Sequence, residues 1–300
     1  MWVKFKEKTY ESYFQTELGR LTNISFAPDQ TDEGLLGFDG AFFIPFIGMT
    51  GLFPYVRVAR WRRFIGISAS EIDSFGDELN DRLPPFNLNL FVQYKRPERM
   101  ARSNAAEWPS WGAAYYRYTT DHRQQHLLEK IANAAHGRAA VVYASPAFWS
   151  NTDLFAHGRD GTIVAHSNIA DVANLTGHHR FSYREAGHHG IGHSEPQPLE
   201  SSPFDAIIRR GIEQDALPFT RQMKALDASI REALDGERGS YRLWQAARQA
   251  ILGGGIADAY PRARGTWLDA IYSVIAFGQA FDVRITALGV DTVAEPVETT

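Results

Sequence analysis

The sequence contains no cysteine. This absence excludes disulfide bonds, a cysteine nucleophile and thiolate-ligated metal sites, and it fits a reducing compartment. No stretch approaches the roughly 18 consecutive apolar residues of a membrane-spanning helix, and the first residues lack the apolar segment of a signal peptide. We therefore expect a soluble cytoplasmic protein without a membrane partner.

Charge of one sign is not in large excess, since the formal net charge is −4 at pH 7. Any binding to nucleic acid must therefore come from a local basic patch and not from a global field. Apolar residues are plentiful, with 44% hydrophobic and 13% aromatic residues, which suffices for a globular core. The length of 300 residues suits one large domain or a domain with a substantial appendage.

Hydrophobic periodicity up to residue 148 alternates between helix and strand. Tyr10, Phe14 and Leu18 recur at helical spacing, and a second helix at 121–137 has an apolar inner face and a terminal glycine. Apolar runs predict strands at 23–28, 34–46, 87–97 and 138–148. This order predicts an α/β fold with a mixed central sheet flanked by helices.

Beyond this core the patterns change. We expect a loop-rich segment with many His and Gly residues, packed on the core, and then a mainly helical C-terminal region and a disordered tail. The predicted organisation is a core at 1–148 with an insertion at 44–88, the loop-rich segment at 149–198, the helical region at 199–290 and the tail at 291–300.

Asp39 is a carboxylate inside the apolar run "GLLGFDGAFFIPF" (34–46). Burying a lone carboxylate is costly, and a divalent cation is a suitable partner for it. Strand alternation places Gly37 and Ala41 on the same face as Asp39, and these small residues leave room for a ligand. Alternatively, Asp39 is a turn or strand-end residue between two glycines.

Gln93 and Lys95 are two residues apart in the strand at 87–97 and so share one face, while Tyr94 points to the other. One interpretation is a strand that emerges into water before Pro97 ends it. The other is an amide and an ammonium group that serve an active site together with Asp39.

Element order and the residues Asp39 and "QYK" (93–95) resemble the PD-(D/E)XK nuclease superfamily over roughly residues 8–148. Asp39 stands for the acidic residue of the second strand, and "QYK" for the Gln-x-Lys version of the third-strand motif. The resemblance implies a restriction-endonuclease-like core, to which a glutamate of the first helix contributes. Glu11 is the best match, with Gln15 as an accessory residue.

The resemblance implies hydrolysis of DNA phosphodiester bonds with Mg²⁺, or with Mn²⁺ in its place, and a role in bacterial restriction or anti-phage defence. Oxygen ligands suit this hard cation. They would be Glu11, Asp39, the side-chain oxygen of Gln93 and the backbone carbonyl of Tyr94. Lys95 would orient or deprotonate the attacking water, or stabilise the developing charge.

Arginines around Trp61 in "VRVARWRRF" (56–64) predict contact with DNA, because arginine pairs with phosphate and tryptophan stacks on bases. A solvated face of the insertion is the alternative. The predicted nucleic-acid-binding residues are Arg57, Arg60, Arg62, Arg63, Arg96, Arg123 and Gln125. The C-terminal helices would support a homo-oligomer or a partner protein.

Two other functions stay open. One is an inactive nuclease fold that binds nucleic acid or a partner protein. The other is a metal enzyme based on histidines, with ligands drawn from His178, His179, His188, His189, His193, Glu185 and Glu195. The histidine spacing matches neither HExxH nor a zinc-finger pattern, and adjacent histidines in a strand point to opposite sides, so we favour turn-forming histidines there.

Overall fold

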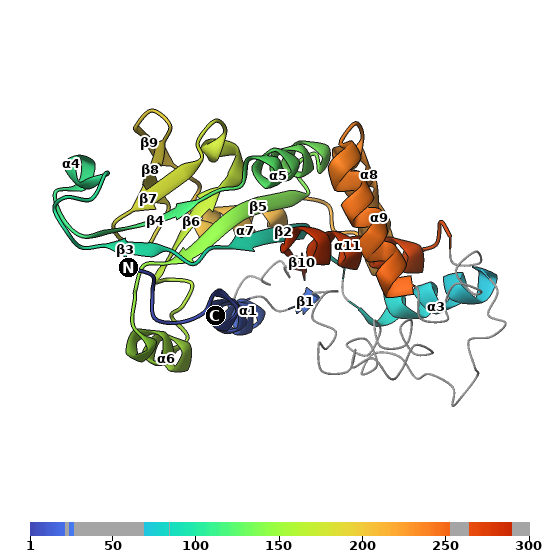
Figure 1. The fold of residues 1–300 in the computed structure, drawn as a ribbon. Coiled ribbons are helices and arrows are strands. Elements are labelled where there is room, and N and C mark those ends of the chain that lie inside the picture. Colours follow the sequence, from blue (N-terminus) through green and yellow to red (C-terminus); the bar gives the residue numbers. More distant parts are fainter. Residues whose placement is uncertain (22–23, 27–68, 84, 253–263, 290–300) are drawn as a thin grey trace, which may run out of the picture.

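The computed structural model describes residues 1–21, 24–26, 69–83, 85–252 and 264–289 (Figure 1). Asp39, the arginines at 57, 60, 62 and 63, and the tail at 291–300 lie outside the described residues, as does most of the insertion at 44–88. The described part is a mixed α/β structure with two sheets flanked by helices. This fold class was predicted from the sequence and is confirmed.

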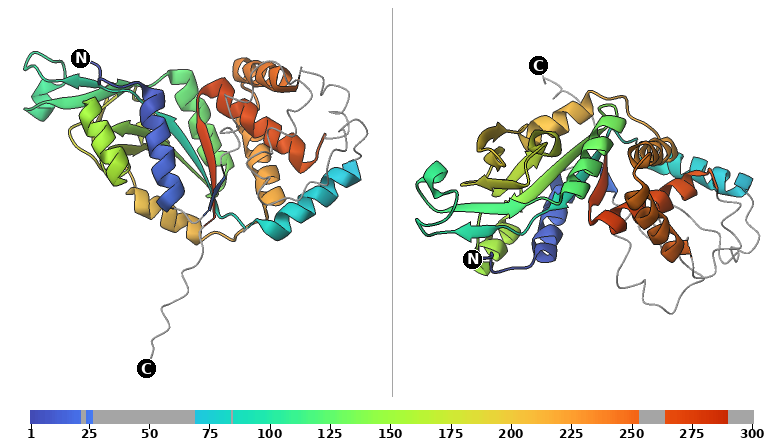
Figure 2. Two further views of the ribbon diagram at one scale, coloured as in Figure 1. Left: turned by 90° about the horizontal axis from the view of Figure 1, so that it is seen from below. Right: turned by 45° about the horizontal axis from the view of Figure 1, so that its top comes forward.

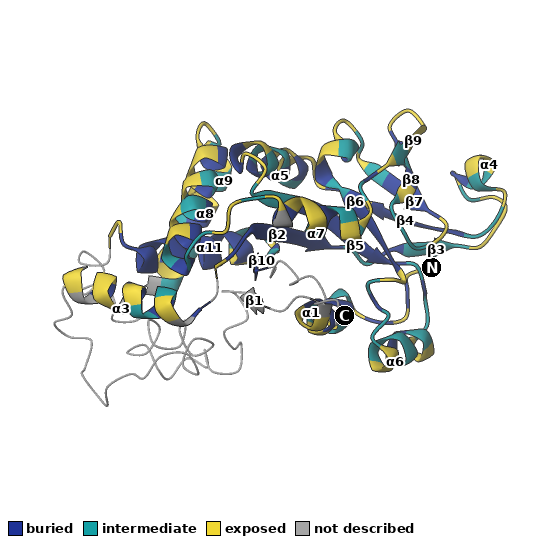
Figure 3. Cartoon of the chain, turned by 180° about the vertical axis from the view of Figure 1, so that it is seen from behind, coloured by how far each residue is buried: buried dark blue, intermediate teal, exposed yellow. Residues whose placement is uncertain are grey.

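The central sheet has five strands and mixed direction. Its order is β1 (Ile24–Phe26), β10 (Arg284–Gly289), β2 (Leu88–Tyr94), β5 (Ala139–Pro146) and β6 (Ser167–Asp171). Strands β2 and β5 are parallel, and the other pairs are antiparallel. The parallel pair requires a crossover, which includes helix α5 (His122–Ala134). Figure 3 shows that this sheet is buried along most of its length.

A second, antiparallel sheet was missed by the sequence analysis. Its order is β3 (Glu98–Met100), β4 (Tyr115–Thr119), β7 (Arg180–Tyr183), β8 (His189–His193) and β9 (Gln197–Glu200). The expectation of a loop-rich segment at 149–198 was therefore wrong. That segment also contains α6 (Asn151–Asp160) and the short helix η2 (Val172–Leu175), and its strands are short and polar on their exposed side.

Helices cover both faces of the central sheet. Helix α1 (Glu7–Leu21) lies on one face with α6 and α7 (Phe204–Ile212), as Figure 2 shows, and α5 lies on the other. The aromatic rings of Tyr10 and Phe14 on α1 contact the ring of Tyr94, with centroids 5.7 and 5.4 Å apart. The hydroxyl of Tyr143 on β5 donates instead to Gln125 on α5. Tyr94 of β2 therefore faces α1, whereas Tyr143 of β5 faces α5.

The C-terminal region is mainly helical, as predicted, but its last described residues form a strand. The helices are α8 (Phe219–Leu234), α9 (Arg238–Leu252) and α11 (Trp267–Phe281), and they pack near α3 (Ala69–Arg82). After Asp282, whose φ is 51°, the chain reverses and β10 enters the sheet between β1 and β2. The C-terminal region is thus part of the central sheet.

One short helix, α4 (Trp108–Trp111), precedes β4 in the second sheet. It begins after Glu107, whose carboxylate is bonded to Tyr115 and Arg180. None of the described helices is both long and apolar enough to cross a membrane.

Candidate active site at the end of strand β2

The "QYK" segment ends β2, and the structure places Gln93 and Lys95 on the face that carries α5. The ammonium group of Lys95 lies 5.2 Å from the ring centre of Tyr143, whose hydroxyl donates to Gln125 of α5 at 2.6 Å. Tyr94 points the other way, and its hydroxyl accepts a 2.7 Å hydrogen bond from Gln15 of α1. Gln15 therefore acts on the α1 face and does not approach Lys95.

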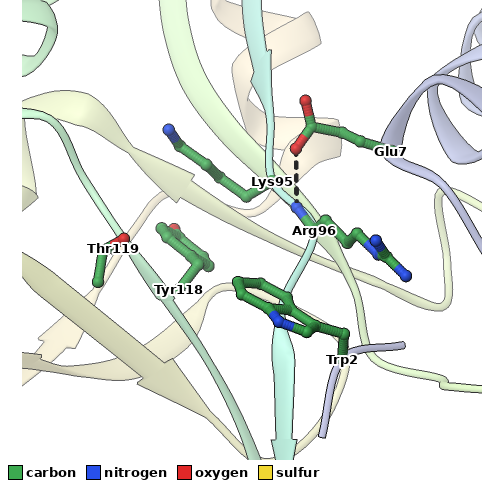
Figure 4. A pocket seen from close by; sticks show the side chains of 6 residues that line it. All are labelled: Trp2, Glu7, Lys95, Arg96, Tyr118 and Thr119. Atoms are coloured by element: carbon green, nitrogen blue, oxygen red, sulfur yellow. Dashed lines mark hydrogen bonds between the residues drawn. The ribbon is translucent and has the colours of Figure 1, made fainter. Parts of the chain in front are cut away.

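A pocket of about 320 Å³ opens beside Lys95. Its walls come from the first residues of the chain, the start of α1, the end of β2 and strand β4 of the second sheet. Figure 4 shows the six lining residues, which are Trp2, Glu7, Lys95, Arg96, Tyr118 and Thr119. The carboxylate of Glu7 accepts the backbone N–H of Arg96 at 2.9 Å, which holds it next to Lys95. An acid, two cations and two aromatic rings thus meet in one pocket.

Burial and neighbouring charges shift the ionisation of the two central groups. Burial lowers the pKa of Lys95, and the charges of Glu7, Asp282 and Asp121 oppose this shift. Burial raises the pKa of Glu7, the charge of Asp282 adds to the rise, and Lys95 and the Arg96 N–H oppose it. The pKa of the acid is raised and that of the base is lowered, so the two pKa values lie closer together than usual. Such shifts are typical of catalytic sites and also of structural ion pairs.

Gln93 contributes an oxygen that the protein does not satisfy. Its amide nitrogen donates to the backbone oxygen of Asp282 at 3.1 Å. Its Oε1 atom is buried and has no hydrogen-bond partner within the described part of the chain. Leaving such an atom unpaired costs about 1–3 kcal/mol, so it is a candidate ligand for something that binds there. An amide oxygen suits a hard divalent cation.

Glu11, the predicted helix ligand, lies on the α1 face and not with Gln93 and Lys95. Its buried carboxylate forms an ion pair with Arg284 of β10, and Lys8 lies 3.2 Å away. Arg284 is paired with Val92, which faces α1. The structure therefore corrects the assignment of Glu11, because its charge is neutralised and the body of the sheet separates it from Gln93.

Glu7 is the carboxylate of α1 that lines the same pocket as Lys95, and the sequence analysis missed it. The sequence analysis based this helix on Tyr10, Phe14 and Leu18, whereas α1 already begins at Glu7. An earlier start would have brought Glu7 into consideration, because it lies one turn before Glu11 on the same side of the helix.

The predicted nucleic-acid contacts on the α5 side have different outcomes. Gln125 is buried, and its side chain forms hydrogen bonds with Tyr143, Val172 and Glu129. It is therefore not accessible to nucleic acid, in contrast to the predicted contact. Arg123 is exposed on α5, and its contact with nucleic acid stays a prediction. The same holds for the backbone carbonyl of Tyr94 as a metal ligand.

Arg96 lines the pocket, and its contact with nucleic acid stays a prediction. One of its guanidinium nitrogens donates to the backbone oxygen of Val3 at 2.7 Å, and the group lies 5.9 Å from the ring centre of Trp2. The start of the chain thus positions Arg96 at the pocket, and Trp2 itself is 53% exposed.

Comparison of the chain with protein-family models finds no match, and neither curated proteins nor solved structures give one. The resemblance to PD-(D/E)XK nucleases therefore stays a prediction. The functional argument rests on the pocket itself.

Proposed function

We propose that this protein is a metal-dependent nuclease that hydrolyses DNA phosphodiester bonds in the Lys95 pocket. The observation that carries the proposal is that Lys95 and Glu7 line one pocket at the end of β2, a strand whose residue Gln93 has a buried oxygen without a hydrogen-bond partner in the described part of the chain. The order α1, β2, α5 and β5, with β2 and β5 parallel, supports a restriction-endonuclease-like core. A role in restriction or anti-phage defence is part of the proposal and comes from the resemblance.

Gln93 and Glu7 offer oxygen ligands of the kind that Mg²⁺ and Mn²⁺ accept. Gln93 Oε1 and the Glu7 carboxylate are the described candidates, and Asp39 is the predicted acid outside the described residues. Both Gln93 and Glu7 neighbour Asp282, the first through a hydrogen bond and the second through its charge. When bound, the ion would supply positive charge that lowers the pKa of a coordinated water.

Lys95 provides the fixed positive charge for the phosphate. Its position over the ring of Tyr143 and its burial hold the ammonium group in one place, which limits the reorganisation needed when charge develops. Its lowered pKa also increases the fraction of neutral amine that can accept a proton from water. The negative charge of Glu7 opposes this lowering of the Lys95 pKa and so favours the protonated ammonium form.

Basic and aromatic side chains next to the pocket support binding to nucleic acid. The guanidinium group of Arg99 and the ammonium group of Lys4 lie 5.0 and 4.5 Å from the ring centre of Trp149. With Trp2 and Arg96 they form a surface on which cations can meet phosphates and exposed rings can stack on bases. Because the net charge is −4, binding to nucleic acid needs a local basic patch, and this surface is the candidate for it.

The direct test is cleavage of duplex DNA, single-stranded DNA and RNA with Mg²⁺, Mn²⁺ or EDTA. We expect cleavage of DNA that depends on the metal and falls about 100-fold or more in Lys95→Ala. Lys224→Ala, which removes an exposed lysine of α8, should cleave like the unmodified protein. Absence of cleavage on every substrate would overturn the proposal, and so would equal rates for Lys95→Ala and Lys224→Ala.

A further inference from the structure

A second group of ligand-type side chains lies at the edge of the second sheet. His188, His189 and Glu200 each offer one atom, and these atoms all lie within 4.8 Å of one another. The Nε2 atoms of His188 and His189 are 3.7 and 3.9 Å from Oε1 of Glu200. Two imidazoles therefore converge on the same carboxylate oxygen.

Local backbone geometry explains why two adjacent histidines converge. Strand β8 begins at His189, so His188 lies just before it and is not bound by strand alternation. Gly187 has a φ of 116°, which turns the chain there, and the two imidazole ring centres lie 4.2 Å apart. The expectation that these adjacent histidines point to opposite sides was therefore wrong.

Backbone hydrogen bonds fix both halves of this group before any ligand binds. His189 is in register with Glu200 across the β8–β9 pair, and the N–H of Ser201 donates to the oxygen of His188 at 2.9 Å. The N–H and the oxygen of Gly187 are both bonded to strand β6, at Ser167 and Ile169. Only side-chain rotations would be needed to adjust the three ligand atoms.

The donor set determines which ion fits. Two imidazole nitrogens and one carboxylate oxygen are ligands that Zn²⁺ and similar transition metals accept, whereas Mg²⁺ prefers oxygen alone. Tetrahedral Zn²⁺ with bonds of about 2.0–2.1 Å places its ligand atoms roughly 3.3 Å apart. The observed separations of 3.7 and 3.9 Å are close to this value. The side chains are 25%, 64% and 70% exposed, so an ion can enter from solvent.

We propose that His188, His189 and Glu200 form a binding site for a divalent transition metal such as Zn²⁺, with water completing the coordination. The bound ion would join the start of β8 to the end of β9 and stabilise this edge of the sheet. The site is separate from the Lys95 pocket, because β8 and β9 lie at the opposite end of the sheet order from β3 and β4 (Figure 1).

Other histidines of this segment have different partners. His193 Nε2 lies 2.7 Å from the hydroxyl of Ser182, and His179 Nδ1 lies 3.0 Å from that of Ser194. The proposed ligand set therefore differs from the sequence-based alternative, since Glu200 replaces Glu185 and Glu195.

The test measures zinc binding to the full chain after removal of any histidine tag and of bound metal. Isothermal titration should give one Zn²⁺ per chain, and Co²⁺ should give the visible absorption of a tetrahedral site with nitrogen and oxygen ligands. His188→Ala and Glu200→Gln should each weaken binding at least tenfold. His122→Ala, which removes an exposed histidine of α5, should bind like the unmodified protein.

Circular dichroism of the metal-free variants separates loss of ligands from loss of fold. All three changes are at partly or fully exposed side chains, so the metal-free spectra and melting temperatures should match. Zn²⁺ should then raise the melting temperature of the unmodified protein and of His122→Ala, but not of His188→Ala. Absence of stoichiometric binding, or equal affinity in His188→Ala and His122→Ala, would overturn the proposal.

Discussion

The carboxylate of Glu7 and the side chain of Lys95 line the same pocket, and the charge of each group changes the pKa of the other. Burial favours the neutral form of both side chains, whereas their mutual attraction favours the charged forms. Burial therefore raises the pKa of Glu7 and lowers that of Lys95, and the charge of each residue opposes the shift of the other.

Removal of the Glu7 charge should lower the pKa of Lys95 further. Glu7→Gln keeps an oxygen that can accept the Arg96 N–H, but it removes the charge that opposes the effect of burial on Lys95. NMR titration of isotopically labelled lysine side chains would measure this shift. Glu232→Gln, at an exposed position of α8, is the matched control and should leave Lys95 unchanged. An unchanged Lys95 pKa in Glu7→Gln would contradict the interaction.

Glu7→Gln and Glu11→Gln should have opposite effects on cleavage rate and on stability. Glu7→Gln should lower the cleavage rate with little effect on stability. Glu11→Gln should lower the free energy of unfolding by about 1–3 kcal/mol, because it removes the negative charge from the buried ion pair with Arg284, and should keep the cleavage rate of the folded protein. Urea unfolding and rates per folded molecule would distinguish them. Loss of cleavage in a fully folded Glu11→Gln variant would restore Glu11 as a metal ligand.

Local pattern was sufficient to predict several helices and strands of the fold and its mixed α/β class. Alternation in "QYK" correctly separates Tyr94 from Gln93 and Lys95, and the helix predicted at 121–137 between two apolar strands is present as α5 between β2 and β5. These features depend on residues that are close in the sequence, so hydrophobic periodicity is enough to predict them.

Long-range pairing was not visible in the sequence. Strand β10 follows a helix of almost wholly apolar residues, and only its pairing with β1 and β2 shows that the helical pattern has ended at Asp282. The approach of Glu200 to His188 likewise depends on the register of β8 and β9. Such contacts are set by tertiary structure and not by local propensity.

Glu107 should make stability depend on acid pH. Burial raises the pKa of this carboxyl, but hydrogen bonds from Tyr115 and Arg180 and the charge of Arg117 outweigh that effect and lower it to about 2. Because the folded pKa is below the ordinary value of 4.5, the stabilisation is complete above about pH 4.5 and is lost as pH falls toward 2.

Glu107→Gln tests this linkage. At pH 7 the variant should lose about 1–3 kcal/mol of unfolding free energy, because two arginines lose their partner charge. The difference from the unmodified protein should shrink as the pH of urea unfolding experiments falls from 5 toward 2. Glu195→Gln, an exposed residue before β9, is the control. A constant difference at all pH values would show that packing and not charge is responsible.

Gln93→Glu should make the protein depend on a divalent cation for stability. The amide nitrogen of Gln93 donates to the backbone oxygen of Asp282, and a carboxylate at the same place would set two acceptors against each other in a buried position. The metal-free variant should therefore melt at a lower temperature than the unmodified protein. Mg²⁺ should raise its melting temperature more than that of the unmodified protein, because the ion offsets the added charge.

Gln93→Leu should respond to Mg²⁺ less than the unmodified protein does. It removes the unsatisfied Oε1 atom together with the hydrogen bond to Asp282, so stability should change little, while any effect of Mg²⁺ on melting temperature and cleavage should decrease. Differential scanning fluorimetry across a Mg²⁺ titration would compare both variants with the unmodified protein. Equal Mg²⁺ responses in Gln93→Glu and Gln93→Leu would show that the ion does not bind at Gln93, because a carboxylate and an isobutyl group cannot coordinate it equally.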